Sequence, residues 1–127
     1  MLDNIETAAN LIEKHIKTGS KIYLPIDCDP DGFTSSYLVY DYIIKNYSQQ
    51  EFHYEIEYHI PEGKEHGLQT LMDDLIEKKK YDLIIVPDAG SNDAEECGIL
   101  SEMGYEICIL DHHMISTPNP YAIIVNN

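Results

Sequence analysis

The chain has 127 residues, of which 23 are Asp or Glu and 8 are basic, and its formal net charge is −15. Every basic residue is Lys, so the composition excludes a broad electrostatic grip on nucleic-acid phosphates by this chain alone. A chain of this length can bury a core of its own, and we expect residues 1–127 to form a single domain.

The cysteines and the lack of targeting signals indicate a compartment. Cys28, Cys97 and Cys108 are scattered, form no Cys-x-x-Cys pair and are typical of free thiols in a reducing cytoplasm. No stretch has the pattern of a signal peptide or of a membrane-spanning helix. We therefore expect a cytoplasmic protein that has no membrane partner.

Hydrophobic periodicity and turn residues predict helices and strands that alternate along the chain. In chain order, the expected elements are a helix over 3–18, a strand over 21–26, a helix over 35–47, a strand over 52–60, a helix over 68–80, a strand over 83–86, a helix that Asp93 caps with Glu96 in capping-box position, a strand over 105–110 and a strand over 121–125. Gly19 ends the first helix. His15 lies near the apolar stripe of that helix and is interpreted as a packing or surface residue, not as a ligand.

Two of these elements carry aromatic residues. In the helix over 35–47, we expect Leu38, Tyr42 and Ile43 to face the core, and its tyrosines are more typical of core and rim packing than of a surface on which bases stack. The stretch 52–60 alternates apolar and polar residues, which predicts an edge strand with one wet face.

The alternation predicts an α/β fold with three layers, in which helices flank a mostly parallel five-stranded sheet. Polar clusters follow three of the apolar strands: Asp27 to Asp31, Asp88, and Asp111 to His113. In open sheets of this kind, sites form at the carboxyl ends of the strands. If the strand order is 2-1-3-4-5, the three strands are neighbours and the clusters converge.

The stretch around Asp27, Asp29 and Asp31 places three carboxylates on alternate positions after a strand. Their mutual repulsion is relieved when cations bind between them, and oxygen donors suit Mg²⁺ or Mn²⁺. Asp-x-Asp-x-Asp-Gly also opens an EF-hand loop, but the closing Glu of that loop would fall on Leu38. The EF-hand interpretation is therefore rejected.

Carboxylates and an imidazole at one sheet edge make a plausible two-metal site, which can bind a phosphoryl oxygen and activate a bridging water. Asp88, alone at its strand end, is suited to bridging both ions. The mixed nitrogen and oxygen ligands favour Mn²⁺ slightly over Mg²⁺. One of His112 and His113 could bind a metal, and the other could hold a phosphate oxygen.

The sequence Asp111-His112-His113 after an apolar strand resembles the signature of the DHH phosphoesterase superfamily. The stretch from Asp27 to Ser35 is similar to that family's first motif in its RecJ-type exonuclease branch, which is specific for single-stranded DNA. Residues 86–92 resemble the second motif, and residues 118–127 resemble the segment after the histidine pair. The resemblance runs from about Lys21 to the last residue.

The resemblance implies a function and a role for each matched residue. It implies a metal-dependent phosphodiesterase or exonuclease core with two Mn²⁺ or Mg²⁺ ions, acting on single-stranded nucleic acid or short nucleotides. The implied metal ligands are Asp27, Asp29, Asp31, Asp88 and His112. His113 would contact the scissile phosphate, and Asp111 would support the loop that carries the histidines.

The sequence also departs from the family pattern. No acidic residue follows Asp111 to match the fourth motif, and an Arg that relatives carry near Ile60 and Pro61 is missing. We expect the N-terminal portion of a DHH domain, without the second domain that binds substrate, and little nuclease activity from the chain alone. A missing domain or partner chain would complete the site.

Two other functional classes remain open at the level of sequence. One is a non-catalytic binding or assembly module that keeps the fold. The other is a phosphotransfer domain of the haloacid-dehalogenase or receiver type, which Asp27, Asp29 and Asp88 suit but the histidine pair does not.

Overall fold

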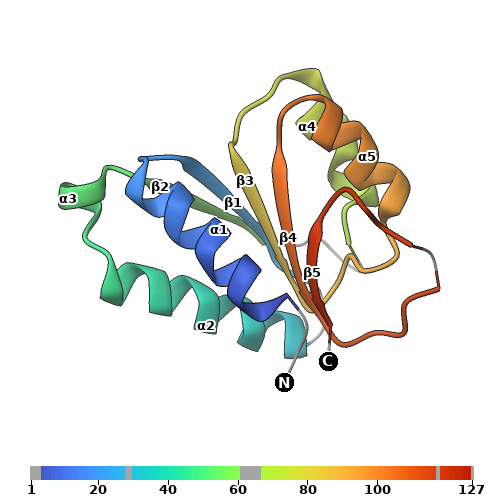
Figure 1. Cartoon of the computed structure of the whole chain (residues 1–127), viewed down its shortest axis with the longest axis horizontal. Helices are drawn as coiled ribbons and strands as arrows, with labels where there is room; N and C mark the ends of the chain where they lie inside the picture. Colours follow the sequence, from blue (N-terminus) through green and yellow to red (C-terminus); the bar gives the residue numbers. More distant parts are fainter. Residues whose placement is uncertain (1–3, 28–29, 61–66, 117, 127) are drawn as a thin grey trace.

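The computed structural model describes residues 4–27, 30–60, 67–116 and 118–126. Five strands form one sheet in the order β2-β1-β3-β4-β5, and each neighbouring pair is parallel (Figure 1). The strands are β1 (Lys21–Pro25), β2 (Glu55–His59), β3 (Leu83–Pro87), β4 (Glu106–Asp111) and β5 (Ile123–Asn126). The predicted α/β sheet and the strand order 2-1-3-4-5 are confirmed.

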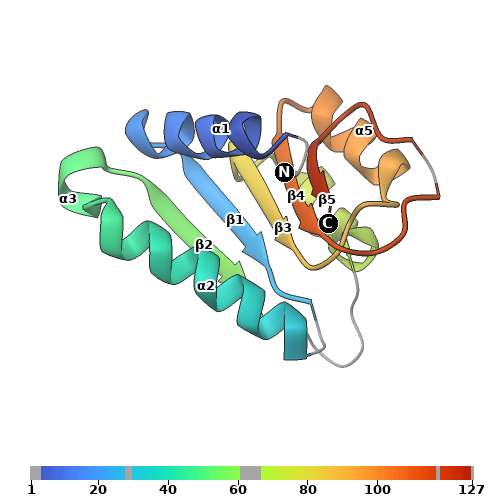
Figure 2. The ribbon, with the colours of Figure 1, turned by 60° about the horizontal axis from the view of Figure 1, so that its bottom comes forward.

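Helices cover both faces of the sheet. They are α1 (Ile5–Lys17), α2 (Pro30–Asn46), α3 (Gln49–Phe52), the short 3-10 helix η1 (Gln69–Leu71), α4 (Met72–Glu77) and α5 (Ala94–Glu102). Figures 1 and 2 show α1 and α2 on one face and α4 and α5 on the other. None of the described helices combines the length and the apolar character needed to cross a membrane.

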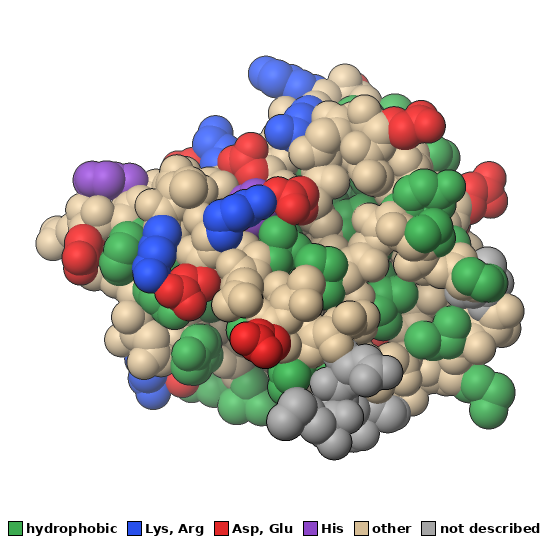
Figure 3. Space-filling model, in the orientation of Figure 1, with side chains coloured by type: hydrophobic (Ala, Val, Ile, Leu, Met, Phe, Trp, Pro, Cys, Tyr) green, Lys and Arg blue, Asp and Glu red, His purple; other side chains and the backbone are tan. Residues whose placement is uncertain are grey.

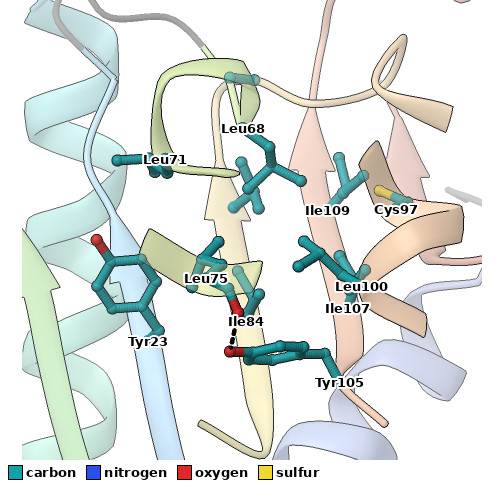
Figure 4. Close-up of a cluster of buried hydrophobic side chains, with 12 residues drawn as sticks. Tyr23, Leu68, Leu71, Leu75, Ile84, Cys97, Leu100, Tyr105, Ile107 and Ile109 are labelled. Atoms are coloured by element: carbon teal, nitrogen blue, oxygen red, sulfur yellow. Dashed lines mark hydrogen bonds between the residues drawn. The ribbon is translucent and has the colours of Figure 1, made fainter. Parts of the chain in front are cut away.

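Each face of the sheet has its own buried core, because successive side chains of a strand point to opposite faces. On β3, Leu83 and Ile85 pack under α1 and α2, whereas Ile84 and Val86 pack under α4 and α5. Figure 4 shows the second core, in which the buried Tyr105 hydroxyl donates a 2.9 Å hydrogen bond to the carbonyl of Leu75. Both faces of β3 are therefore buried, as its continuous apolar sequence predicts.

Helix α2 begins earlier than expected, at Pro30 instead of residue 35. Proline suits the first turn of a helix because its missing N–H has no helical partner there. Only a narrow stripe that includes Ser36 and Ile43 is buried, so the inward orientation predicted for Leu38 and Tyr42 is wrong: each is 60% exposed. Both line a groove between α2 and α1 instead.

The strand expected over 52–60 is shorter in the structure. Phe52 ends the short helix α3, whose first turn is capped by Ser48: its Oγ accepts a 3.3 Å hydrogen bond from the N–H of Glu51. Tyr54 is buried, and its hydroxyl donates to the carbonyl of Tyr47 at 2.8 Å. Strand β2 does form an edge of the sheet, as predicted.

The connection from β4 to β5 contains no helix in its described part, residues 112–116 and 118–122. It returns past α5 as a loop, and the ring of Tyr121 lies against Gly98 of that helix, where an added Cβ would sit 3.2 Å from Cε2. The loop positions both the histidine pair at its start and β5 at its end.

Candidate metal centre

Three buried acids meet at the carboxyl ends of the neighbouring strands β1, β3 and β4. Asp27, Asp88 and Asp111 are 5%, 3% and 6% exposed. Together with His113 they line one cavity of about 320 Å³. Parallel strands end at the same edge of a sheet, so the convergence that the sequence predicted follows from the strand order.

Gly32, in the first turn of α2, lies very close to the backbone of Asp27. An added Cβ on Gly32 would lie 2.6 Å from the carbonyl oxygen of Asp27, which leaves room for glycine alone. This close approach lets α2 begin directly beside the buried Asp27. Asp31, in the first turn of α2, is exposed beside the cavity.

Asp88 follows β3 in the left-handed backbone region, with φ of 64°. Asp tolerates this region better than most residues, and its N–H donates a 2.6 Å hydrogen bond to the carbonyl of Leu110 in the neighbouring strand β4. Its Oδ1 lies 2.5 Å from Nε2 of His112. The turn therefore brings a buried carboxylate against an imidazole from the next strand end.

The carboxylate of Asp111 organises the histidine loop. Its Oδ1 accepts hydrogen bonds from the N–H of His112 at 2.7 Å and from Nδ1 of His113 at 2.5 Å. Its Oδ2 accepts from the N–H of Ser91 at 3.2 Å. Because Nδ1 of His113 is occupied, Nε2 is the ring nitrogen left to contact another group.

The same contacts shift the two pKa values in opposite directions. Burial raises the pKa of Asp111, but hydrogen bonds from His113, His112 and Ser91 outweigh it and hold that pKa below its usual value. The hydrogen bond to Asp111 raises the pKa of His113, with help from the charges of Asp88 and Asp27. The four side chains therefore form one electrostatic unit.

Two asparagines also hold the histidine loop. Nδ2 of Asn126, in β5, donates to the carbonyl of His113 at 2.8 Å and to Oγ of Ser91 at 3.0 Å. Asn92 donates to the carbonyl of Met114 at 2.9 Å and accepts from the N–H of Ser116 at 2.7 Å. The rings of His112 and His113 stack with centroids 4.6 Å apart. The loop is thus fixed from β5 and from the turn after β3.

The donor atoms fit a divalent cation. Asp31, Asp88 and His112 each offer one ligand atom within 4.8 Å of the other two, and Asp111, His112 and His113 form a second such group. Carboxylate oxygens with imidazole nitrogen are a donor set that Mn²⁺ accepts. Asp88 and His112, which contact each other directly here, are the residues of the first group that would hold such an ion together with Asp31.

The structure brings together Asp27, Asp31, Asp88, Asp111, His112 and His113. Asp29 lies outside the described residues, as does the turn expected at 61–63. Sequence reasoning assigned no role to Asn92 and Asn126, and it did not expect Gly67 and Gln69 at the cavity. The one signal in the sequence is Gly67 itself, since its left-handed φ of 65° favours glycine. No sequence pattern indicates which residues face Gly67 across the cavity.

Asp93 behaves differently from the capping residue that was expected. It occupies the N-cap position of α5, but its side chain makes no capping hydrogen bond. Instead its Oδ2 accepts from the N–H of Leu68 at 2.9 Å. The carboxylate therefore ties the segment that starts at Gly67 to the cavity wall.

Residues 21–127 match the family described as DHH family, N-terminal domain. The chain is 39% identical, over 99% of its length, to a Bacillus subtilis protein named "Putative SPbeta prophage-derived single-strand DNA-specific exonuclease YorK", of which it covers 20%. It is 26% identical, over 98% of its length, to the single-stranded-DNA-specific exonuclease RecJ of Thermus thermophilus, of which it covers 18%. The chain thus spans about a fifth of the length of these curated relatives.

Two solved structures have the same arrangement of elements. The crystal structure of RecJ in complex with Mn²⁺ from Thermus thermophilus superposes with a TM-score of 0.75 at 25% identity, over 98% of this chain and 17% of that one. A structure of exonuclease RecJ bound to manganese gives a TM-score of 0.79 at 24% identity, over 99% of this chain and 31% of that one. At 24% identity, the likeness to the second of these structures is a likeness of fold alone.

Proposed function

The chain belongs to the DHH family, and from this membership we propose that it carries the divalent-metal site of a phosphodiesterase that cleaves single-stranded nucleic acid. The observation that carries the proposal is the grouping of Asp31, Asp88 and His112, whose donor atoms lie within 4.8 Å of one another at the carboxyl edge of the sheet. The names of the relatives, which are exonucleases specific for single-stranded DNA, support the choice of substrate.

In this proposal, Asp27, Asp29, Asp31, Asp88 and His112 hold Mn²⁺ or Mg²⁺, with two ions in the complete site. The burial of Asp27 and Asp88 supports their part, because buried carboxylates favour a charged partner. Asp29 rests on the sequence motif. When bound, the ions would polarise a phosphoryl oxygen and lower the pKa of a water.

The remaining side chains position the substrate. His113 presents Nε2 to a phosphate oxygen, because Asp111 occupies its Nδ1 and Asn126 holds its backbone carbonyl. Asp111 sets the orientation of the ring and of the histidine loop. Catalysis requires such fixed positioning in addition to the metal.

The charge of the chain limits what it does by itself. With a net charge of −15 and no Arg, it repels a polyanion wherever metal does not intervene. The family description and the coverage of about a fifth support the proposal that residues 1–127 are the N-terminal portion of a larger catalytic domain. Hydrolysis by this chain alone should therefore be weak, and metal binding is the sharper test.

The test is calorimetric titration of Mn²⁺ into the 127-residue chain, with Mn²⁺-dependent hydrolysis of a labelled single-stranded oligonucleotide measured in parallel. We expect Mn²⁺ to bind, and Asp88→Asn and His112→Ala to weaken binding at least tenfold. His113→Ala should leave Mn²⁺ affinity within about threefold and reduce any hydrolysis. Equal Mn²⁺ affinity in wild type and in both ligand variants would overturn the proposal.

A non-catalytic binding module is the second candidate, and the strongly acidic, arginine-free composition favours it over an autonomous nuclease. It predicts Mn²⁺ binding that depends on Asp88 but hydrolysis that no metal concentration restores. The phosphotransfer alternative loses its support, because the matched family is a different one.

A further inference from the structure

A second cavity, of about 270 Å³, lies between α2 and the edge strand β2. Its walls include Ile26, Phe33, Ser36, Tyr37, Tyr40 and Tyr58. All of its lining side chains are uncharged, in a chain whose net charge is −15. The occupant that fits such walls is neutral and has apolar faces.

The aromatic side chains of this cavity are unusually accessible. Phe33, Tyr37 and Tyr58 are 45%, 63% and 50% exposed, although the sequence pattern favoured packing for the tyrosines of α2. Phe33, Tyr37 and Tyr40 recur at helical spacing, so they share one face of α2. Tyr58 of β2 closes the far wall and meets Tyr40 edge to face, with centroids 5.6 Å apart. Exposed aromatic faces of this kind are platforms on which planar rings stack.

Ser36 supplies an independent sign of a ligand. It is 1% exposed, and its Oγ has no hydrogen-bond partner among the described residues. A buried hydroxyl without a partner is costly, and most buried polar groups avoid that state. Because Ser36 lines the cavity, an entering group with a donor or an acceptor can satisfy it.

The cavity lies beside the candidate metal centre. Ile26 directly precedes Asp27, and Phe33 follows Asp31 in the first turns of α2. From Asp31 to Tyr37 the helix rises about 9 Å, which is on the scale of a single nucleotide. Figure 3 shows hydrophobic side chains exposed along the lower edge of the molecule, where α2 runs.

We propose that this cavity is a nucleobase subsite, in which one base stacks on Phe33 and Tyr37 and bonds to Oγ of Ser36. The inference rests on the proposed function, because the bound phosphate of the same nucleotide would lie at the metal centre. Stacking accepts any base, since each has a π-face, whereas the single hydroxyl favours bases with a polar edge toward it.

The experiment titrates the ¹⁵N-labelled chain, in Mg²⁺, with dAMP and with deoxyribose 5-phosphate, and follows the backbone amide signals. We expect dAMP to shift the amides of Phe33, Ser36 and Tyr37, and the base-free sugar phosphate to leave them in place. Tyr37→Ala should weaken dAMP binding about tenfold. Tyr42→Ala is the matched control: Tyr42 lies on the same helix, is 60% exposed and lines the other groove, so this variant should bind as wild type.

Ser36→Ala separates a ligand contact from a structural role. It removes a hydroxyl that has no partner among the described residues, so the melting temperature should not fall. It should weaken dAMP binding about three- to tenfold. Unchanged dAMP affinity in Ser36→Ala and in Tyr37→Ala would overturn the subsite.

Two further outcomes distinguish a failure of the subsite from a failure of the metal centre. If deoxyadenosine, which has no phosphate, shifts the cavity amides in wild type and in Asp88→Asn alike, the subsite stands even where Mn²⁺ fails to bind. If dAMP and deoxyribose 5-phosphate bind equally, the subsite fails and the metal centre is untouched. Cavity signals that change on dilution of the chain, with no response to dAMP, would identify a protein contact and overturn the proposal.

Discussion

At the amino end of the sheet, Asp82 and Glu106 have cationic partners within the protein. Asp82 accepts a 2.9 Å hydrogen bond from the N–H of Lys21 and pairs with Lys79 at 3.5 Å. Glu106 pairs with Lys14 at 3.0 Å and with the buried His15 at 2.9 Å. At the carboxyl end, Asp27, Asp88 and Asp111 meet without a lysine among the described residues that line their cavity.

The contrast separates two uses of acidic side chains. Where the cation belongs to the protein, as in the pair of Glu106 and Lys14, the acid fastens secondary structure and needs nothing from solution. Where three buried carboxylates face two imidazoles, their repulsion is relieved best by a mobile cation. Four measurements test this contrast.

The largest effect should be metal-dependent stabilisation. With Mn²⁺ a hundredfold above its Kd, the native state should gain about 2.7 kcal/mol and the melting temperature should rise by roughly 10 °C. Asp88→Asn should lose about half of the rise or more, because a Kd at least tenfold higher leaves at most about 1.4 kcal/mol, whereas Asp82→Asn, the matched change at the amino end, should keep it. Thermal melts with and without Mn²⁺ measure this, and equal rises in both variants would remove the distinction between the two ends.

Next in size is the loss of the Asp111 carboxylate. Asp111→Ala leaves the N–H groups of His112, His113 and Ser91 without their acceptor, so the free energy of unfolding should fall by about 2 kcal/mol. Glu106→Ala, whose pairs are partly exposed, should lower it by under about 1 kcal/mol. Urea unfolding curves compare the two variants. A larger loss in Glu106→Ala would show that the amino end, not the histidine loop, depends more on its acid.

A lysine placed in the acidic cavity should give its carboxylates a cationic partner within the protein, such as the acids at the amino end of the sheet already have. Gln69 is exposed and lines the cavity, so Gln69→Lys should stabilise the metal-free chain by about 0.5 kcal/mol and weaken Mn²⁺ binding roughly tenfold. Gln50→Lys, the same substitution in the distant α3, should do neither. Calorimetry and metal-free melts supply both readouts, and identical behaviour of the two variants would contradict the electrostatic account.

The smallest effect concerns pH at the amino end. The hydrogen bond from the N–H of Lys21 lowers the pKa of Asp82 below its usual value of 3.8. Its stabilisation is therefore complete above that value and is lost as the pH falls from there through the lowered pKa. Asp82→Asn should cost about 0.5 kcal/mol at about pH 6 and less at about pH 3. Unfolding free energies of both proteins at the two pH values test this, and a difference that grows on acidification would refute the sign.

Much of the site followed from the sequence because local signals determined it. The apolar runs located β1, β3 and β4, and polar residues follow each of them directly, so the strand order alone placed Asp27, Asp88 and Asp111 together. The sequence pattern favoured a packing or a surface role for His15, and the structure shows packing: His15 is buried, and its Nδ1 lies 2.8 Å from Oγ of Ser20.

The errors arose where distant contacts outweigh local preference. The helix α2 carries apolar residues on several sides, so periodicity did not determine that Leu38 and Tyr42 face outward. The carboxylate of Asp93 satisfies Leu68, which is 25 positions away, instead of its own helix. Asn126 donates to Ser91, which is 35 positions away in the sequence, and no short motif predicts that contact.

The left-handed backbone at Asp88 limits which substitutions at position 88 the fold can accept during evolution. Asn and Gly tolerate that backbone as well as Asp does, whereas Glu or Ala would strain it. If Asp88 holds the proposed metal, lineages that cease to use that metal can drift at position 88 toward Asn or Gly without losing the fold, while Gly32 stays fixed by its contact with Asp27. A DHH relative with glycine at the position of Gly32 and Asn or Gly at that of Asp88 would be a descendant that kept the architecture and gave up the chemistry.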